Sequence, residues 1–191
     1  PPEVERCIRE VGMGFMFAPK FHPAMRHAAG PRREMGIRTV FNILGPLTNP
    51  AGASAQVIGV GDPGLGEKIA RALVLLGCGR AMVVHSEDGL DEISLAPRTR
   101  VWELRGGTVY SYDIQPGQLG LGTAPREALK GGSSQDNALI LQGVLQGREG
   151  PPRDVVILNA GAALVVAGKA GDLKEGLALA RQAIASGKAQ E

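Results

Sequence analysis

The sequence predicts an α/β fold, in which a mostly parallel sheet is flanked by helices and carries a β-hairpin excursion. Two apolar runs, 57–60 and 81–85, enclose an amphipathic pattern at 66–76, which is the order of a βαβ unit. Two alternating runs then follow within 99–112, and they are typical of a hairpin. Strands alternating with helices therefore indicate one α/β domain.

The first third of the chain predicts two helices and a short strand. Residues 3–10 have helical periodicity, with acidic residues near the positive end of the helix dipole. Residues 15–17 form an apolar run that predicts a strand. Residues 23–35 predict a basic helix, which Gly30 and Pro31 are expected to kink or restart.

The middle of the chain has the clearest patterns. The run at 57–60 is bounded by Gly and Asp-Pro and predicts a strand, and Gly77 is expected to end the helix at 66–76. The run at 81–85 predicts a buried strand. Gly106 and the glycine after it separate the two hairpin strands.

The last third predicts mainly helices. Residues 136–146 form one, with Ser133 or Ser134 as the expected N-cap. Periodicity leaves 153–158 open between a strand and the first turn of a helix. The remaining patterns predict a helix within the Ala-rich residues 159–168 and an amphipathic helix at 173–186.

Composition narrows the class of protein. With 191 residues and 43% hydrophobic residues, the chain can bury a core of its own. A net charge of +2 is too small to indicate a nucleic-acid partner. Cys7 and Cys78 are too few for a disulfide framework, which favours a reducing, cytoplasmic setting. No apolar run approaches the roughly 20 residues that span a bilayer, so no membrane partner is expected.

Asp91 and Glu92 are the strongest local site candidates. They follow a buried strand and a turn that contains Gly89, so they are expected at the carboxyl end of a sheet strand, where open α/β sheets bind ligands. Adjacent carboxylates offer the hard oxygen ligands that Mg²⁺ prefers. The alternative is a solvated acidic turn, and spacing alone does not separate the two.

Residues 36–50, Gly-Ile-Arg-Thr-Val-Phe-Asn-Ile-Leu-Gly-Pro-Leu-Thr-Asn-Pro, form an apolar run that ends in a rigid two-step turn. Together with the His-Pro-Ala-Met sequence at 22–25, this segment closely resembles the anthranilate phosphoribosyltransferase family. The segment 88–94, Asp-Gly-Leu-Asp-Glu-Ile-Ser, also resembles a family segment, whose Asp-Glu pair holds magnesium on phosphoribosyl diphosphate.

The resemblance implies an enzyme that transfers the phosphoribosyl group from phosphoribosyl diphosphate to the amine of anthranilate, releasing diphosphate, in tryptophan biosynthesis. Asp91 and Glu92 match the metal-binding pair, so the implied cofactor is Mg²⁺. Arg32 matches the arginine that grips the anthranilate carboxylate, a task that suits its planar fork. A register error of one residue would assign this role to Arg33, and the alternative is a surface ion pair with Glu34. No residue is assigned to acid–base catalysis.

The resemblance covers residues 1–191 and implies the C-terminal part of the family's α/β domain. The family's donor-binding motifs, Gly-Thr-Gly-Gly-Asp and Lys-His-Gly-Asn-Arg, do not occur in the chain, and its N-terminal helical domain is expected to be absent. We therefore expect this chain to be inactive alone. The family dimerises through the helical domain, so a homodimer is expected for the complete protein.

Two other functions remain open from the sequence. A pyrimidine nucleoside phosphorylase shares the fold and also cleaves at C1 of a ribose, but the Asp91–Glu92 pair and the basic residues Arg32 and Arg33 argue against it. A non-catalytic nucleic-acid-binding relative would need a strongly basic surface, which the net charge does not favour.

Overall fold

A computed structural model describes residues 2–21, 34, 45, 47–49 and 51–190 of the chain. The chain divides into two compact units, Pro1–Gly52 and Ala53–Glu191, and each is described separately. Among the described residues, no helix is both long enough and apolar enough to cross a membrane.

The first unit contains helices α1 (Pro2–Val11) and α2 (Ala18–Phe21) among its described residues. The helix predicted at 3–10 is therefore confirmed. The strand predicted at 15–17 is wrong, because these residues have no regular secondary structure and the Phe15 side chain is exposed. Three apolar residues bury too little surface to offset the cost of ordering a strand. Apart from residue 34, the helix predicted at 23–35 lies outside the described residues.

The second unit is built on a four-stranded sheet, in the order β1-β2-β3-β4. The strands are β1 (Ala55–Gly59), β2 (Arg80–Ser86), β3 (Thr99–Arg105) and β4 (Thr108–Ile114). The pair β1–β2 is parallel, whereas β2–β3 and β3–β4 are antiparallel. The predicted α/β class and the hairpin are confirmed, but the described sheet is mixed rather than mostly parallel. The hairpin accounts for this difference, because β3 pairs along the whole length of β2 instead of standing apart from the sheet.

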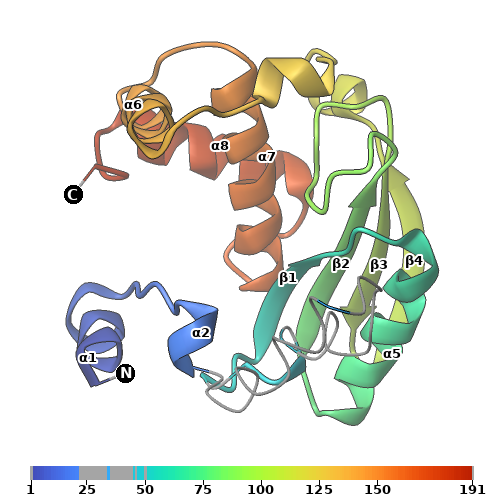
Figure 1. Ribbon diagram of the computed structural model, residues 1–191. Helices are drawn as coiled ribbons and strands as arrows, with labels where there is room; N and C mark the ends of the chain where they lie inside the picture. The colour runs from blue at the N-terminus through green and yellow to red at the C-terminus, as the bar shows by residue number, and fades with distance from the viewer. Residues whose placement is uncertain (1, 22–33, 35–44, 46, 50, 191) are drawn as a thin grey trace. The chain divides into compact units, whose positions relative to one another are not determined.

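Seven helical segments complete the second unit, and Figure 1 shows their arrangement. They are η1 (Pro63–Leu65), α5 (Gly66–Leu75), η2 (Pro116–Leu119), η3 (Arg126–Leu129), α6 (Ser134–Leu145), α7 (Pro151–Val166) and α8 (Leu173–Ala185). Helix α5 connects the two parallel strands and contacts β2 and β3, while α7 contacts β1 and β2 and packs on α8. The helices predicted at 66–76, 136–146 and 173–186 are confirmed.

The segment 153–158, left open between strand and helix, lies in α7 together with the predicted helical residues 159–168. Pro151 and Pro152 occupy its first turn, where a missing amide hydrogen costs nothing. Helix α7 packs closely on α8, since a Cβ at Gly161 would lie 2.7 Å from a methyl carbon of Leu177. The helix is thereby fixed between α8 and the sheet.

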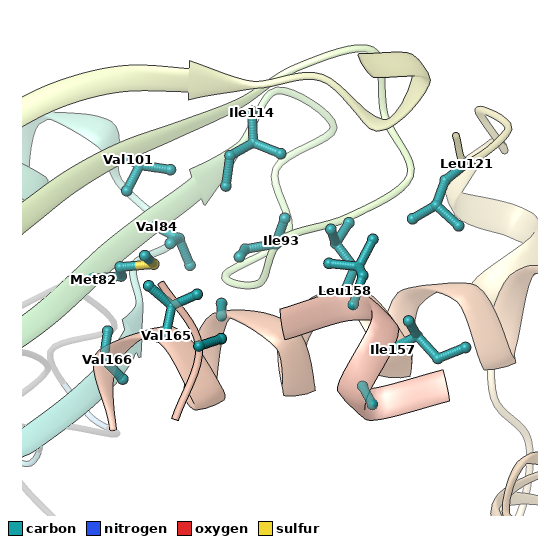
Figure 2. Close-up of a cluster of buried hydrophobic side chains, with 14 of the residues drawn as sticks. Met82, Val84, Ile93, Val101, Ile114, Leu121, Ile157, Leu158, Val165 and Val166 are labelled. Carbon is teal, nitrogen blue, oxygen red and sulfur yellow. The ribbon is translucent and has the colours of Figure 1, made fainter. Parts of the chain in front are cut away.

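The face of the sheet that meets α7 carries the main apolar cluster (Figure 2). Met82, Val84 and Val101 contribute from the strands, and Leu158 and Val165 from α7. The segment after β2 also enters this cluster, through the fully buried side chain of Ile93 and through Leu95, which is 1% exposed. The loop that carries the predicted metal ligands is thus anchored in the core at its downstream end.

Candidate functional site

The site lies where the parallel strands β1 and β2 end. The amide of Val60 donates to the carbonyl of Val84 at 2.9 Å, which continues the pairing one residue beyond β1. Nδ1 of His85 lies 2.8 Å from the carbonyl oxygen of Val60 and donates to it. The carboxyl ends of both strands are therefore tied together at one edge, the position at which α/β sheets bind ligands.

Asp91 lies directly against this edge. A Cβ built on Gly59, the last residue of β1, would collide with the carbonyl group of Asp91. The main chain of Asp91 can approach so closely because residue 59 has no side chain. The prediction that Asp91 and Glu92 follow the carboxyl end of a strand is thus confirmed.

A tight turn brings the loop back to β2 before it reaches Asp91. The carboxylate of Asp88 accepts a hydrogen bond from the amide of Leu90 at 3.1 Å, and Gly89 has a φ of 84°, which a residue with a side chain rarely adopts. The amide of Ser86 donates to the carbonyl of Leu90 at 3.0 Å. The turn thereby fixes where the loop starts towards Asp91.

A buried hydroxyl network holds the base of the loop. The Oγ atoms of Ser86 and Ser94 lie 2.6 Å apart, and neither residue is exposed to solvent. Ser94 Oγ also accepts the amide of Ala96 at 2.9 Å, while Thr99 Oγ1 donates to Ser86 Oγ at 3.4 Å. These contacts join the end of β2, the loop and the start of β3.

The side chain of Asn159 in α7 binds the loop from the opposite side. Its Oδ1 accepts the amide of Ile93 at 3.1 Å, and its Nδ2 donates to the carbonyl of Ile93 at 2.7 Å. Nδ2 also donates to the carbonyl of Val155 at 2.9 Å, within the same helix. The amide of one side chain therefore satisfies both peptide groups of the residue that follows Glu92.

Sequence reasoning missed Asn159, Ser86 and Ser94. Asn159 had a usable signal, because it is a polar residue inside the apolar stretch 155–166 of a helix, where an unpaired amide is costly. The two serines had no such signal, since serine is equally common in exposed turns.

The Asp91 and Glu92 side chains are exposed, so water, metal and substrate oxygens can all reach them. Among the described residues, no group of three acidic, His or Cys side chains is placed to hold a metal ion. A pair of carboxylates still suits Mg²⁺, which commonly binds one or two carboxylates together with substrate phosphates and waters. The donor set thus fits magnesium held jointly with a phosphorylated ligand.

A cavity of about 720 Å³ opens beside Glu92. Leu90 and Glu92 line it, and Arg126 and Lys130 bring positive charge to it. The rest of the lining comes mainly from η3, α6 and α7 and is mostly apolar, apart from Glu127 and Asn137. Arg126 also donates to the carbonyl of Asp88 at 3.4 Å, which connects this wall to the loop. The cavity therefore combines both signs of charge with an apolar surface.

The residue predicted to bind the anthranilate carboxylate is not among the described residues. Arg32 and its alternative Arg33 lie outside the described residues, as does most of the segment 36–50. Among the described positions of that segment, Asn49 accepts the amide of Ala51 through Oδ1 at 3.0 Å, a turn-forming role that is common for asparagine.

Comparisons with known proteins agree on one family. The family described as "Glycosyl transferase family, a/b domain" matches residues 1–190. The anthranilate phosphoribosyltransferase of Symbiobacterium thermophilum is 53% identical over 190 residues, which span 100% of this chain and 56% of that protein. The crystal structure of the Thermus thermophilus enzyme of the same name superposes with a TM-score of 0.91 at 52% identity, covering 98% of this chain and 55% of that one.

A more distant structure has a bound donor and metal. Anthranilate phosphoribosyltransferase from Saccharomyces cerevisiae in complex with PRPP and Mg matches with a TM-score of 0.79 at 29% identity, covering 88% of this chain and 49% of the yeast chain. The chain thus spans about half the length of the relatives that it matches. The resemblance stated from residues 36–50 and 88–94 is confirmed by these relatives.

Proposed function

The chain belongs to the glycosyl transferase family with the a/b domain, and on this premise we propose that it forms the metal-binding part of an anthranilate phosphoribosyltransferase. The reaction joins the amine of anthranilate to C1 of the ribose and releases diphosphate. The observation that carries the proposal is the position of Asp91 and Glu92, which are exposed beside the carboxyl ends of two parallel strands.

Charge separation is the main chemical demand of this reaction. Positive charge develops on the ribose ring while negative charge develops on the leaving diphosphate, and the neutral aniline nitrogen needs little help to attack. Fixed charges and correct positioning are therefore worth more than acid–base groups. The Asp91 and Glu92 carboxylates would hold Mg²⁺, which would supply positive charge to offset the charge that develops on the leaving group.

The acceptor requires a partner for its carboxylate. We assign this contact to Arg32, because it occupies the matching position of the family segment and a guanidinium can bind both carboxylate oxygens. The contact orients the amine towards C1 and contributes mainly to binding of anthranilate.

The donor requires residues that this chain does not contain. Since the Gly-Thr-Gly-Gly-Asp and Lys-His-Gly-Asn-Arg motifs do not occur in it, the 191-residue chain by itself is expected to give no turnover. The full-length protein that carries this chain is expected to be a cytoplasmic homodimer. Measurable turnover by the isolated chain would contradict this part of the proposal.

The test follows the fluorescence of anthranilate after phosphoribosyl diphosphate is added to the full-length protein, with and without Mg²⁺. We expect Mg²⁺-dependent loss of fluorescence. The double variant Asp91→Ala/Glu92→Ala should lower kcat by an amount equivalent to on the order of 2–4 kcal/mol. Arg32→Ala should act mainly by raising KM for anthranilate, and Arg33→Ala tests the neighbouring register.

Glu87→Ala serves as the matched control, because Glu87 is an exposed carboxylate on the same loop that pairs with Arg98 at 3.4 Å. Its kcat and its Mg²⁺ requirement should stay near those of the wild type. Unchanged Mg²⁺-dependent turnover in the double variant would falsify the metal assignment, and wild-type protein without turnover would overturn the proposed reaction.

A further inference from the structure

We propose that Asn159 positions the loop of residues 87–93, called the metal loop here. In this role it holds Asp91 and Glu92 in the geometry that binds the metal ion. This inference rests on the proposed function, because it assigns a task to a residue that touches neither metal nor substrate. The juxtaposition that carries it is the side-chain amide of α7 lying against the main chain of Ile93, next to Glu92.

The contact restrains the loop more firmly than a single hydrogen bond. Oδ1 of Asn159 accepts from the Ile93 amide at 3.1 Å, and Nδ2 donates to the Ile93 carbonyl at 2.7 Å, so the side chain pairs with the loop as a neighbouring strand would. Two antiparallel bonds to one residue fix both the position and the rotation of its backbone. The direction in which the preceding Glu92 leaves the chain is fixed with them.

The amide itself is held in one orientation. Both Nδ2 hydrogens are used, one by Ile93 and the other by the carbonyl of Val155 at 2.9 Å. Flipping the amide would place the Nδ2 group against the Ile93 amide and Oδ1 against two carbonyl oxygens, which would lose all three bonds. The side chain is therefore a rigid link between α7 and the loop.

The loop is restrained on its other side by β1. The carbonyl group of Asp91 packs against Gly59, so the segment 91–93 lies between the end of β1 and helix α7. Ile93 is fully buried, whereas Asp91 and Glu92 are exposed. The main chain on either side of Glu92 is therefore fixed, at Asp91 by β1 and at Ile93 by α7. Because the backbone that carries the two exposed carboxylates is already ordered, binding a metal ion would cost little further entropy.

The rival interpretation is a purely structural tie between helix and loop. That role predicts lower stability without any specific change in metal affinity. The variants Asn159→Asp and Asn159→Leu separate the two: Asp keeps the shape and an acceptor for the Ile93 amide but loses both Nδ2 donors, and Leu loses every bond. Leu177→Val is the control for stability, because Leu177 is 1% exposed and contacts Gly161 on α7.

The experiment uses the full-length protein and three readouts. Binding of Mn²⁺ in the presence of phosphoribosyl diphosphate is followed by electron paramagnetic resonance, the Mg²⁺ concentration for half-maximal activity by anthranilate fluorescence, and protection of the Ile93 amide by hydrogen exchange. We expect both Asn159 variants to weaken Mn²⁺ binding about tenfold or more, to raise the Mg²⁺ requirement in parallel, and to leave KM for anthranilate within about twofold of the wild type. Protection at Ile93 should fall.

Each result has a defined meaning. Mn²⁺ binding by the Asn159 variants equal to that of Leu177→Val, at matched stability, overturns the positioning role while leaving the proposed function intact. Wild-type protein that turns over without Mg²⁺, or does not turn over, overturns the proposed function and this inference together. Weakened Mn²⁺ binding restricted to the Asn159 variants supports both.

Discussion

The hydroxyl oxygens of Ser86 and Ser94 lie 2.6 Å apart at the base of the loop that carries Asp91 and Glu92, and both residues are completely buried. Seven residues lie between them, and within this segment the loop makes its turn and exposes the carboxylates of Asp91 and Glu92 as well as that of Glu87. The exposed part of the loop is therefore anchored by a buried pair of hydroxyl groups. Losing a hydrogen bond at this position would lower the stability of the fold, because a buried group without a partner has no water to replace it.

Ser94→Ala should destabilise the chain by about 1–3 kcal/mol, because the Ser86 hydroxyl and the Ala96 amide each lose a buried partner. Urea unfolding of the full chain measures the difference. Ser186→Ala is the control, since Ser186 is exposed and bonds only to its own helix, and its effect should stay within about 0.5 kcal/mol. Equal losses in the two variants would remove the argument for the buried pair.

Gly59→Ala should disturb the loop through simple overlap of atoms, because the added methyl group would meet the Asp91 carbonyl. We expect a loss of about 1–3 kcal/mol or more, as for other overpacked sites, together with weaker metal binding in the full-length protein. Gly61→Ala provides the comparison two residues away, where an added Cβ would meet no atom within 4 Å. A Gly59 variant as stable as the Gly61 variant would show that β1 does not confine the loop.

Tyr112 should make the chain sensitive to alkaline pH. Burial raises the pKa of the Tyr112 phenol above its ordinary value of 10.0, and the neighbouring carboxylate of Glu103, which accepts its hydrogen bond, raises this pKa further. The phenol ionises more readily in the unfolded chain, so its contribution to stability is complete below pH 10 and declines as the pH rises above 10.

The measurement is the free energy of unfolding between pH 9 and roughly pH 11.5, a window that brackets the pKa of an unperturbed tyrosine. Tyr112→Phe should flatten the alkaline decline and should cost about 1.5–3 kcal/mol at neutral pH, because the buried Glu103 loses a hydrogen bond. Tyr110→Phe changes a more exposed phenol on the same strand and should keep the wild-type slope. A wild-type slope in the Tyr112 variant would argue against this assignment.

The N-terminus of α6 offers a test at acidic pH. Hydrogen bonds from the side chain and then the backbone of Ser133 lower the pKa of Asp136 below 3.8, and in return Ser133 Oγ accepts the Asp136 amide at 3.2 Å. The stability that these capping bonds contribute is fully present above the ordinary pKa of 3.8. It should be lost as the pH falls through the lower pKa of the folded state. In Ser133→Ala, an NMR titration should find the Asp136 pKa moved back upwards, and an unchanged value would mean that the capping box does not form.

Much of the fold follows from local patterns in the sequence. The helix at 66–76 lies between two apolar runs, and the structure has a parallel strand pair joined by α5, because periodicity of this kind reports which side chains are buried. The glycines at 106 and 107 likewise located the hairpin, since both have a positive φ. Periodicity does not show which strand a hairpin will pair with. The sequence therefore predicted a mostly parallel sheet, whereas the described sheet is mixed.

The candidate site is likewise predictable from the sequence only in part. Asp91 and Glu92 were found because a local motif contains both acids and the preceding turn. Asn159 and Ile93 are 66 residues apart, and no pattern within a helix indicates which loop one of its part-buried polar residues will meet. Contacts over such distances depend on tertiary packing, which a single sequence does not display.

The distance in sequence between Ile93 and Asn159 also has a consequence during synthesis. A ribosome adding roughly 5–20 residues per second needs about 3–13 s to proceed from one to the other. Throughout that interval the nascent chain already carries both acidic residues, but the helix that restrains them has not yet been made. A cation that meets the emerging polypeptide therefore finds a loose acidic loop, and the finished geometry is available only after α7 has left the exit tunnel.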